Sequence, residues 1–238
     1  MDQKGKFFVI DGTDGSGKGT QTRILIEKLK NEGYNVLEVD FPQYGKKSAG
    51  MVEEYLNGKF GDFDEVSAYQ ASIFYACDRF SASRDMKKHL ENGGIILGNR
   101  YVSSNQIHQS SKITDKEELD KFLVWLEDLE FNIFKIPKPD RVFFLNMPYE
   151  IGQKFVKKKS TEERSYIEND EKVDIHESSK NHMRDAYMRA CELVDRFDYW
   201  TEVKSVKQDG ELKTIEKIND EIYNLIKKEL IEPKIKLN

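Results

Sequence analysis

The stretch IDGTDGSGKGTQ, residues 10–21, combines glycines and a lysine in the pattern of a phosphate-binding loop. Gly12 opens the stretch and the pair Gly17-Lys18 closes it, which is the spacing G-x-x-x-x-G-K. Glycines let consecutive backbone N–H groups curl around an anion, and the lysine brings a mobile positive charge to the outer phosphates of a nucleotide. We therefore predict a nucleotide site here. It is formed by Gly12, Asp14, Gly15, Ser16, Gly17, Lys18, Gly19 and Thr20.

The loop departs from the usual pattern at one position. The residue after the lysine is normally Ser or Thr, but here it is Gly19, and Thr20 comes one place late. Because Gly19 has no side chain to touch a metal ion, we expect Mg²⁺ to be held mainly by nucleotide oxygens and water. The loop alone indicates a nucleotide kinase or another NTPase, and it leaves the phosphate acceptor open.

The flanking pattern predicts the strand and the helix that such a loop requires. Residues 6–11 form an apolar run typical of a buried parallel strand, and residues 18–32 carry apolar side chains at helical spacing. Further strands are predicted at 34–40, 95–99, 140–147 and 202–207, and long helices at 65–91, 115–134, 176–199 and 215–230. This alternation favours an α/β fold with a five-stranded parallel sheet and helices on both faces. No repeat or linker interrupts the chain, so we expect a single domain over residues 1–238.

Composition narrows the classes of protein further. Hydrophobic residues make up 38% of the chain and charged residues 34%, which is typical of a globular protein with a densely charged surface. The net charge of -5 implies no general affinity for nucleic acid or for an anionic membrane, and no apolar run is long enough to span a bilayer. The two cysteines, Cys77 and Cys191, are expected to be buried or partly buried thiols in a reducing cytoplasm.

Four further stretches occur in a characteristic order: FP at 41–42, FYACDR at 74–79, NRYVSSN at 99–105 and PKPD at 137–140. Together with the phosphate loop, this ordered set resembles the thymidylate kinase family, whose members phosphorylate dTMP with ATP. The resemblance implies a P-loop kinase fold with a short lid, ATP and Mg²⁺ as cofactors, and a cytoplasmic enzyme. It also implies a homodimer built through the long helices at 65–91 and 115–134.

Two arginines suit the handling of phosphates, since each guanidinium offers a planar fork to phosphate oxygens. By resemblance, Arg79 grips the phosphate of dTMP, and Arg100 lies between the acceptor and donor phosphates. Lys18 and Arg100 are therefore expected to be catalytic. Asp14 looks misplaced beside phosphates, but the family uses it to hold the sugar 3′-hydroxyl and to contact the arginines.

The thymine base needs a flat partner and polar contacts at its edge. The family stacks an aromatic ring four residues before the helix arginine, which is Tyr75 here, although Phe74 could serve if the helix register differs. His108 stands where the family has Tyr or Phe near the sugar 2′ carbon, unless it faces away from the sugar. The remaining residues expected around dTMP are Phe41, Pro42, Ser104 and Asn105.

The polar stretch at about 154–175 resembles the family's lid. Members of the family carry a catalytic arginine either in the phosphate loop or in the lid. Because the phosphate loop here contains no arginine, we expect the lid to supply this positive charge, from Arg164 or from a lysine at 157–159. The stretch lacks the family's usual lid ending and reads equally well as a solvated charged loop. A second departure is Asn99, where the family usually has an Asp that orients Mg²⁺ through water. Either the metal is held without that charge, or activity is reduced.

Other functions stay open at this stage. The chain could be an adenylate kinase, which shares GKGTQ, or a deoxynucleoside kinase with Glu38 or Asp40 as its base. It could also be a nucleotide-binding protein that has lost catalysis, which Gly19 and Asn99 would explain.

Overall fold

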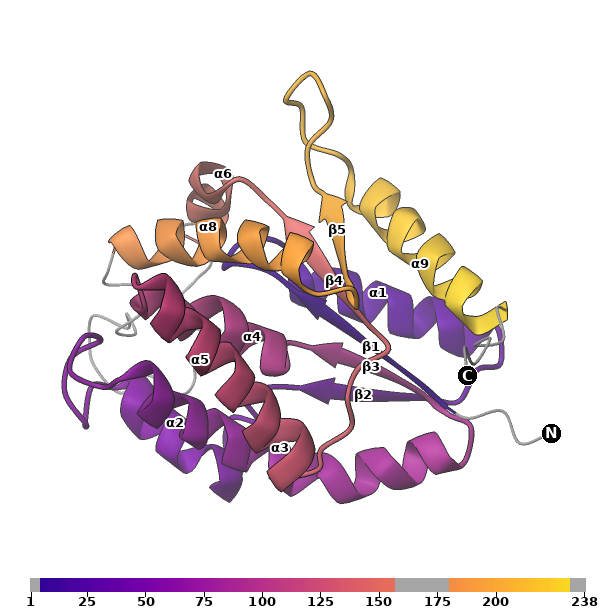
Figure 1. Cartoon of the computed structure of the whole chain (residues 1–238). Coiled ribbons are helices and arrows are strands. Elements are labelled where there is room, and N and C mark those ends of the chain that lie inside the picture. The colour runs from indigo at the N-terminus through magenta and orange to yellow at the C-terminus, as the bar shows by residue number, and fades with distance from the viewer. Residues whose placement is uncertain (1–4, 157–179, 232–238) are drawn as a thin grey trace.

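The structure is a computed structural model that describes residues 5–156 and 180–231. Its centre is a five-stranded sheet in the order β2-β3-β1-β4-β5, and every neighbouring pair is parallel. The strands are β1 Lys6–Asp11, β2 Val36–Asp40, β3 Ile95–Asn99, β4 Arg141–Asn146 and β5 Trp200–Lys204. The predicted α/β class with a five-stranded parallel sheet is confirmed (Figure 1).

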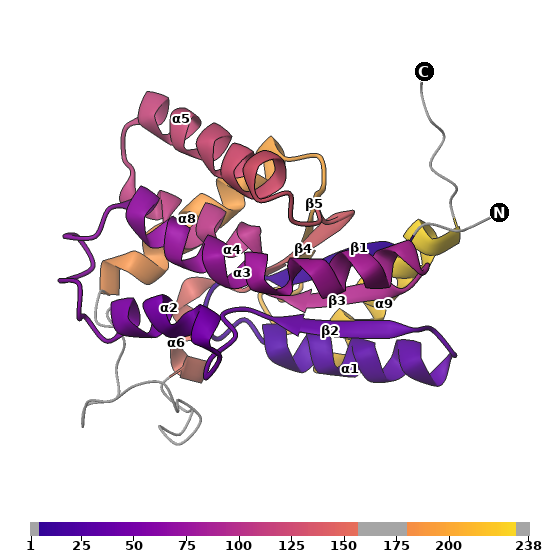
Figure 2. The same cartoon turned by 90° about the horizontal axis from the view of Figure 1, so that it is seen from below.

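Helices cover both faces of this sheet, as Figure 2 shows. One face packs against α1 (Lys18–Asn31) and α9 (Ile215–Ile231). The other packs against α3 (Ala68–Glu91), α4 (Val102–His108), α5 (Lys116–Glu127) and α8 (Lys180–Arg196). Alternate residues of one strand serve the two cores, because successive side chains point to opposite faces: Phe7 and Val9 face α3 and α5, while Phe8 and Ile10 face α1 and α9.

The smaller elements are α2 (Gly50–Leu56), α6 (Tyr149–Val156) and three short helices. These are η1 (Lys47–Ala49), η2 (Ser110–Lys112) and the π turn η3 (Asp128–Ile133). None of the helices within the described ranges is long and apolar enough to cross a membrane.

Two predicted boundaries are wrong in an informative way. The fifth strand begins at Trp200, not at residue 202, because Trp200 is buried and pairs in register with Val142 of β4. The predicted helix at 115–134 is α-helical only to Glu127 and continues as η3. In that π turn Phe134 N donates to Leu129 O at 2.8 Å, and the changed register turns Glu130 into the core.

The topology creates a crevice at the carboxyl ends of β1 and β3. These strands are neighbours, but the chain leaves β1 towards α1 on one face and leaves β3 towards α4 on the other. Open α/β sheets bind ligands at such a switch point. The phosphate loop, the segment after β2 and the segment after β3 all end at this edge.

Candidate active site

A cavity of about 680 Å³ lies at this edge of the sheet. Its walls come from the phosphate loop, the loops after β2 and β3, α3, α4, α6 and the segment between β5 and α9. Of the residues predicted for the site, it is lined by Asp14, Gly15, Ser16, Gly17, Lys18, Gly19, Thr20, Phe41, Pro42, Tyr75, Asn99, Arg100, Ser104, Asn105 and His108.

The phosphate loop is shaped by its glycines. Gly17 has φ of 89° and stands at the N-cap of α1, so the first N–H groups of that helix open towards the loop. Gly15 has φ of 80°, and a Cβ built on it would lie 2.2 Å from Gly152 O of α6. The loop can therefore lie against α6 only because residue 15 is glycine. Gly12, the first glycine of the motif, adopts φ of 156° at the end of β1.

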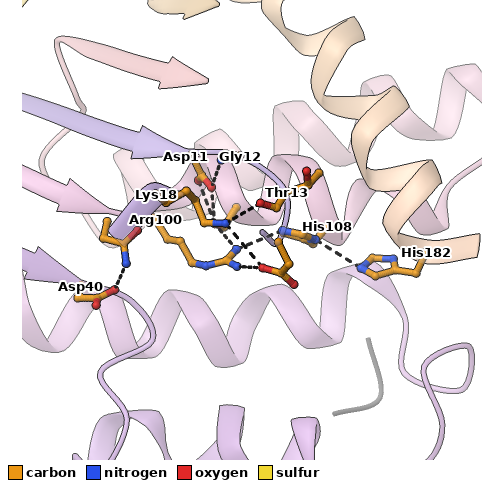
Figure 3. Close-up of polar contacts among 11 residues, drawn as sticks. Asp11, Gly12, Thr13, Lys18, Asp40, Arg100, His108 and His182 are labelled. Atoms are coloured by element: carbon orange, nitrogen blue, oxygen red, sulfur yellow. Dashed lines mark hydrogen bonds and ion pairs between the residues drawn. The ribbon is translucent and has the colours of Figure 1, made fainter. Parts of the chain in front are cut away.

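Lys18 is folded back over the loop that it follows. Its Nζ donates to Thr13 O at 2.9 Å and lies 3.6 Å from Asp14 Oδ1 (Figure 3). The side chains of Thr13 and Ser16 are buried, and their hydroxyls have no hydrogen-bond partner among the described residues. This loop therefore offers backbone donors, two hydroxyls and an ammonium group to an anion.

Arg100 is held at the centre of the cavity by an acid from the phosphate loop. One of its terminal nitrogens pairs with Asp14 Oδ1, and Nη1 lies 3.4 Å from Ser104 Oγ and 3.2 Å from His108 Nε2. Its backbone adopts φ of 63°, a conformation uncommon for non-glycine residues that occurs often at functional sites. Burial lowers the pKa of Arg100, but the charges of Asp14 and Asp11 outweigh it and raise that pKa above its usual value.

Asp11 is a site residue that sequence reasoning missed. It is fully buried and accepts from Gly12 N at 2.8 Å, Ser103 Oγ at 2.5 Å and Ser104 Oγ at 2.9 Å. These bonds tie the start of α4 to the phosphate loop. A charged residue ending an apolar strand was the available signal, since a buried carboxylate needs several donors to offset its lost hydration.

Of the two aromatic candidates on α3, Tyr75 faces the cavity and Phe74 does not. The Phe74 ring lies 5.4 Å from that of Phe60, centroid to centroid, while the Tyr55 ring contacts both candidates, at 6.1 Å from Phe74 and 6.4 Å from Tyr75. Adjacent helical residues point about 100° apart, so only one of them can face the ligand. The expectation for Phe74 is corrected accordingly.

Arg79 also lies elsewhere than expected. Its side chain is buried, its Nε donates to Glu130 Oε1 at 3.0 Å, and Nη1 donates to Tyr101 O at 3.3 Å. It is not among the residues that line the cavity, so the structure does not bring it to the expected place beside the phosphate of dTMP. The π turn η3 places Glu130 against α3, and this acid takes the guanidinium fork. The neighbouring Asp78 accepts instead from Gln43 N at 2.8 Å.

Asn99 lies beside the carboxylate of Asp40. Its Nδ2 donates to Asp40 Oδ1 at 2.9 Å, across the neighbouring ends of β3 and β2. Its Oδ1 is buried and has no hydrogen-bond partner within the described part of the chain. Desolvation raises the pKa of Asp40, although the charge of Arg100 and the bond from Asn99 oppose the shift. A Cβ on Gly19 would lie 3.9 Å from Asn99 Nδ2, so the usual hydroxyl position of the loop faces this pair.

Arg164, and all but the first residues of the predicted lid at 154–175, lie outside the described residues. Residues 154–156 end α6, and two of them, Phe155 and Val156, line the cavity. Other lining residues were not predicted: Gln21 and Tyr101 belong to the quoted motifs but were assigned no role, and the rest come from distant parts of the chain. They are Gln21, Tyr44, Leu56, Tyr101, Gln109, Met147, Leu212, Lys213, Ile215 and Ile218.

Comparison with known proteins agrees with this geometry. A family model described as "Thymidylate kinase" matches residues 10–209. A probable thymidylate kinase of Thermococcus onnurineus is 30% identical over 95% of this chain and 99% of its own length. The thymidylate kinase of Plasmodium falciparum is 25% identical over 97% of this chain and 94% of its own length. A solved structure of a Candida albicans thymidylate kinase shares the fold, with a TM-score of 0.70 at 21% identity, and the match covers 95% of this chain and 92% of that one.

Proposed function

This chain belongs to the thymidylate kinase family and transfers a phosphoryl group from ATP to dTMP, and from that premise we propose that Lys18 and Arg100 carry out the transfer. The observation that supports this most directly is the ion pair of Arg100 with Asp14. It puts the guanidinium beside the phosphate loop, where a second phosphate would meet the first.

The donor half of the site is the phosphate loop and the start of α1. Its N–H groups and Lys18 would hold the β- and γ-phosphates of ATP. The cavity continues past this loop to Leu212, Lys213 and Ile215, between β5 and α9. We place the adenine there, because these residues line the same cavity as the phosphate loop and come from a different part of the chain than the acceptor residues of α3 and α4.

The acceptor half lies between α3, α4 and the loop after β2. Tyr75 offers its ring to thymine, and the buried Phe41 closes the wall behind it. Asn105, Ser104 and His108 reach the base and the sugar from α4. Asp14 would take the sugar 3′-hydroxyl, while the guanidinium meets the phosphate.

The reaction needs little covalent work from the protein. A phosphate oxygen of dTMP bonds to the γ-phosphorus of ATP, the bond from that phosphorus to the β-phosphate oxygen breaks, and ADP leaves. Charge shifts towards the transferring group and the leaving oxygen, so catalysis is positioning plus charge neutralisation. Lys18 and Arg100, which both lie beside Asp14 Oδ1, would supply that neutralisation.

We propose that Mg²⁺ is held at Asn99 and Asp40. The residues fit, since a buried amide oxygen without a hydrogen-bond partner among the described residues and an adjacent carboxylate are hard oxygen donors of the kind Mg²⁺ prefers. Bound there, Mg²⁺ would neutralise the donor phosphates. The negative charge missing at residue 99 is thus present on the neighbouring strand, at Asp40.

We also propose that the enzyme is a cytoplasmic homodimer that pairs through α3. Ile73, Cys77 and Phe80 recur at helical spacing on one side of α3, and Ile73 is 43% and Phe80 51% exposed. The Phe80 ring lies 5.1 Å from that of Phe134, the residue after η3, which widens the apolar patch. A second copy of the same patch would cover it by two-fold symmetry.

A coupled assay of ADP release with purified protein, ATP and Mg²⁺ tests the function. dTMP should give the highest kcat/KM in a panel with dUMP, dCMP, AMP, GMP and thymidine. Preference for AMP or for thymidine would overturn the assignment. Subcellular fractionation tests the cytoplasmic location.

A further inference from the structure

A chain of polar contacts links Arg100 to α8. Arg100 Nη1 lies 3.2 Å from His108 Nε2, and His108 Nδ1 lies 3.4 Å from His182 Nε2 (Figure 3). On its far side, His182 Nδ1 lies 3.3 Å from Ser111 Oγ, which donates to His108 O at 2.8 Å. His182 is 4% exposed, and its ring lies 4.4 Å from that of Phe63, centroid to centroid.

Arg100 determines which atom donates and which accepts in every hydrogen bond of this series of contacts. A guanidinium can only donate, so His108 Nε2 must accept and carries no proton. The proton of a neutral His108 is then on Nδ1, which donates to His182 Nε2. His182 in turn carries its proton on Nδ1, facing Ser111. The hydroxyl proton of Ser111 is already given to His108 O, so its oxygen is available to accept.

The arrangement therefore requires both imidazoles to be neutral, each with its proton on Nδ1. A proton on His182 Nε2 would face the Nδ1–H of His108. Burial lowers the pKa of His182 to about 4, and Lys112 acts in the same direction against the opposing charge of Asp14. His89, the remaining histidine in the described part of the chain, has the opposite tautomer. Its Nε2 lies 3.1 Å from Asn35 O and 3.0 Å from Ile95 O, so there Nε2 must carry the proton.

We propose that His182 is a positioning residue for phosphoryl transfer: by accepting from His108, it keeps an unprotonated nitrogen facing Arg100 and so fixes the guanidinium in the site. Without an acceptor at His182, the proton of His108 is no longer tied to Nδ1. The Nε2–H tautomer would then point an N–H at the N–H of Arg100 and displace it. The proposal rests on the proposed catalytic role of Arg100.

Two substitutions separate this role from simple packing. His182→Leu fills the space of the imidazole with an apolar side chain and removes the hydrogen-bond acceptor. His182→Gln places an amide oxygen near the position of Nε2 and keeps the acceptor. We expect His182→Leu to lower kcat about tenfold with the KM for ATP unchanged, because a displaced catalytic group loses rate rather than donor binding. His182→Gln should stay within about threefold of the parent enzyme, since the acceptor remains in place.

The imidazole tautomers give a readout that does not depend on activity. In ¹⁵N NMR of the full chain, His108 should show Nδ1–H in the parent protein and in His182→Gln. In His182→Leu it should show Nε2–H or a mixture, while His89 keeps Nε2–H throughout as the internal control.

The outcomes are distinct. If His182→Leu and His182→Gln lose the same activity, or if His108 keeps its tautomer in His182→Leu, the positioning role is wrong. If Arg100→Ala is as active as the parent while the tautomers behave as described, the proposed role of Arg100 fails and the contact chain stands without a catalytic purpose. If the His182→Leu protein does not fold, the NMR spectra of the parent protein and of His182→Gln still test the proposal. The Nε2–H tautomer of His108 in either spectrum would overturn it.

Discussion

At the scale of single residues, the site brings two cations and two acids within reach of one another. Lys18 and Arg100 both lie near Asp14, and Asp11 holds the hydroxyls of Ser103 and Ser104 beneath them. The acids keep the cations in place and offset their mutual repulsion. When phosphates arrive, the same cations can turn to them with little reorganisation, which is the property that electrostatic catalysis requires.

Lys18→Ala and Arg100→Ala should each lower kcat/KM for dTMP phosphorylation by about 10²-fold or more, because each removes charge stabilisation from the transferring phosphoryl group. Steady-state kinetics of ADP release measures the loss. Arg23→Ala is the matched control: Arg23 lies on the same helix as Lys18, but its side chain is 67% exposed and pairs only weakly with Glu27 at 3.6 Å. Near-parent turnover in either active-site variant would refute that residue's role.

The proposed Mg²⁺ site at Asn99 and Asp40 can be tested by exchanging the acid and the amide between the two positions. Asp40→Asn removes the carboxylate and should raise the Mg²⁺ concentration for half-maximal rate about tenfold, in line with the loss of other metal-supporting groups. The exchanged variant Asp40→Asn/Asn99→Asp returns one acid and one amide to the same two positions, which are joined by a 2.9 Å bond, and should recover most of the affinity. Titration of the initial rate with Mg²⁺ is the measurement. If Asp40→Asn titrates like the parent, Mg²⁺ is held without Asp40.

At the scale of elements, the positions of side chains depend on how helices end. The π turn η3 rotates Glu130 into the core beneath α3, where it takes the fork of Arg79. Glu130 Oε2 has no partner among the described residues, so the pair satisfies only part of its hydrogen-bonding capacity. On the other side of the site, Gly152 lets α6 lie on the phosphate loop, since a Cβ there would be 2.8 Å from Asp14 O.

Breaking this buried pair should cost stability and leave substrate binding intact. Arg79→Met strands a buried carboxylate and should lower the free energy of unfolding by about 3 kcal/mol, whereas Arg79→Met/Glu130→Leu should recover most of that loss. Arg141→Met is the control, because the half-exposed pair of Arg141 with Glu229 should contribute about 1 kcal/mol or less. Urea denaturation gives these values. A large rise in the KM for dTMP in the stable double variant would show that Arg79 reaches the substrate after all.

At the scale of the whole molecule, the sheet divides the protein into two cores and leaves one edge for binding. Alternate strand residues fill the two cores, and the loops after β1, β2 and β3 meet at the carboxyl edge. The residues of the proposed donor and acceptor halves line one cavity, so in our proposal the two phosphates meet at Arg100. The apolar side of α3 stays on the surface, on the opposite side of that helix from the core.

The homodimer proposal is tested on that surface. Phe80→Glu should convert the dimer to a monomer at micromolar concentration, since a charge at the centre of an apolar interface is left desolvated and unpaired. Met188→Glu is the control, because Met188 on α8 is 61% exposed and lies outside the α3 patch. Light scattering coupled to size exclusion reports the mass. A monomeric parent protein, or a dimeric Phe80→Glu, would exclude this interface.

The sequence by itself determined the fold class and predicted most of the residues that line the cavity, because both depend on local order. Apolar runs of strand length, glycine spacing and a lysine at the start of a helix act over a few residues, and they predicted the loop at 12–20 and the segment at 99–108 correctly as parts of one edge. The choice between Phe74 and Tyr75 needed only the helix register, which a shift of one residue reverses.

Tertiary structure alone decided what Arg79, Asn99 and His108 contact. Their partners, Glu130, Asp40 and His182, lie 51, 59 and 74 residues away in the chain. No local pattern reports such a pairing, because it depends on helix register, on strand order and on the packing of α8 against α4. The same arginine fork that suits a phosphate also suits a buried carboxylate. Which of the two it meets is settled only when the elements pack.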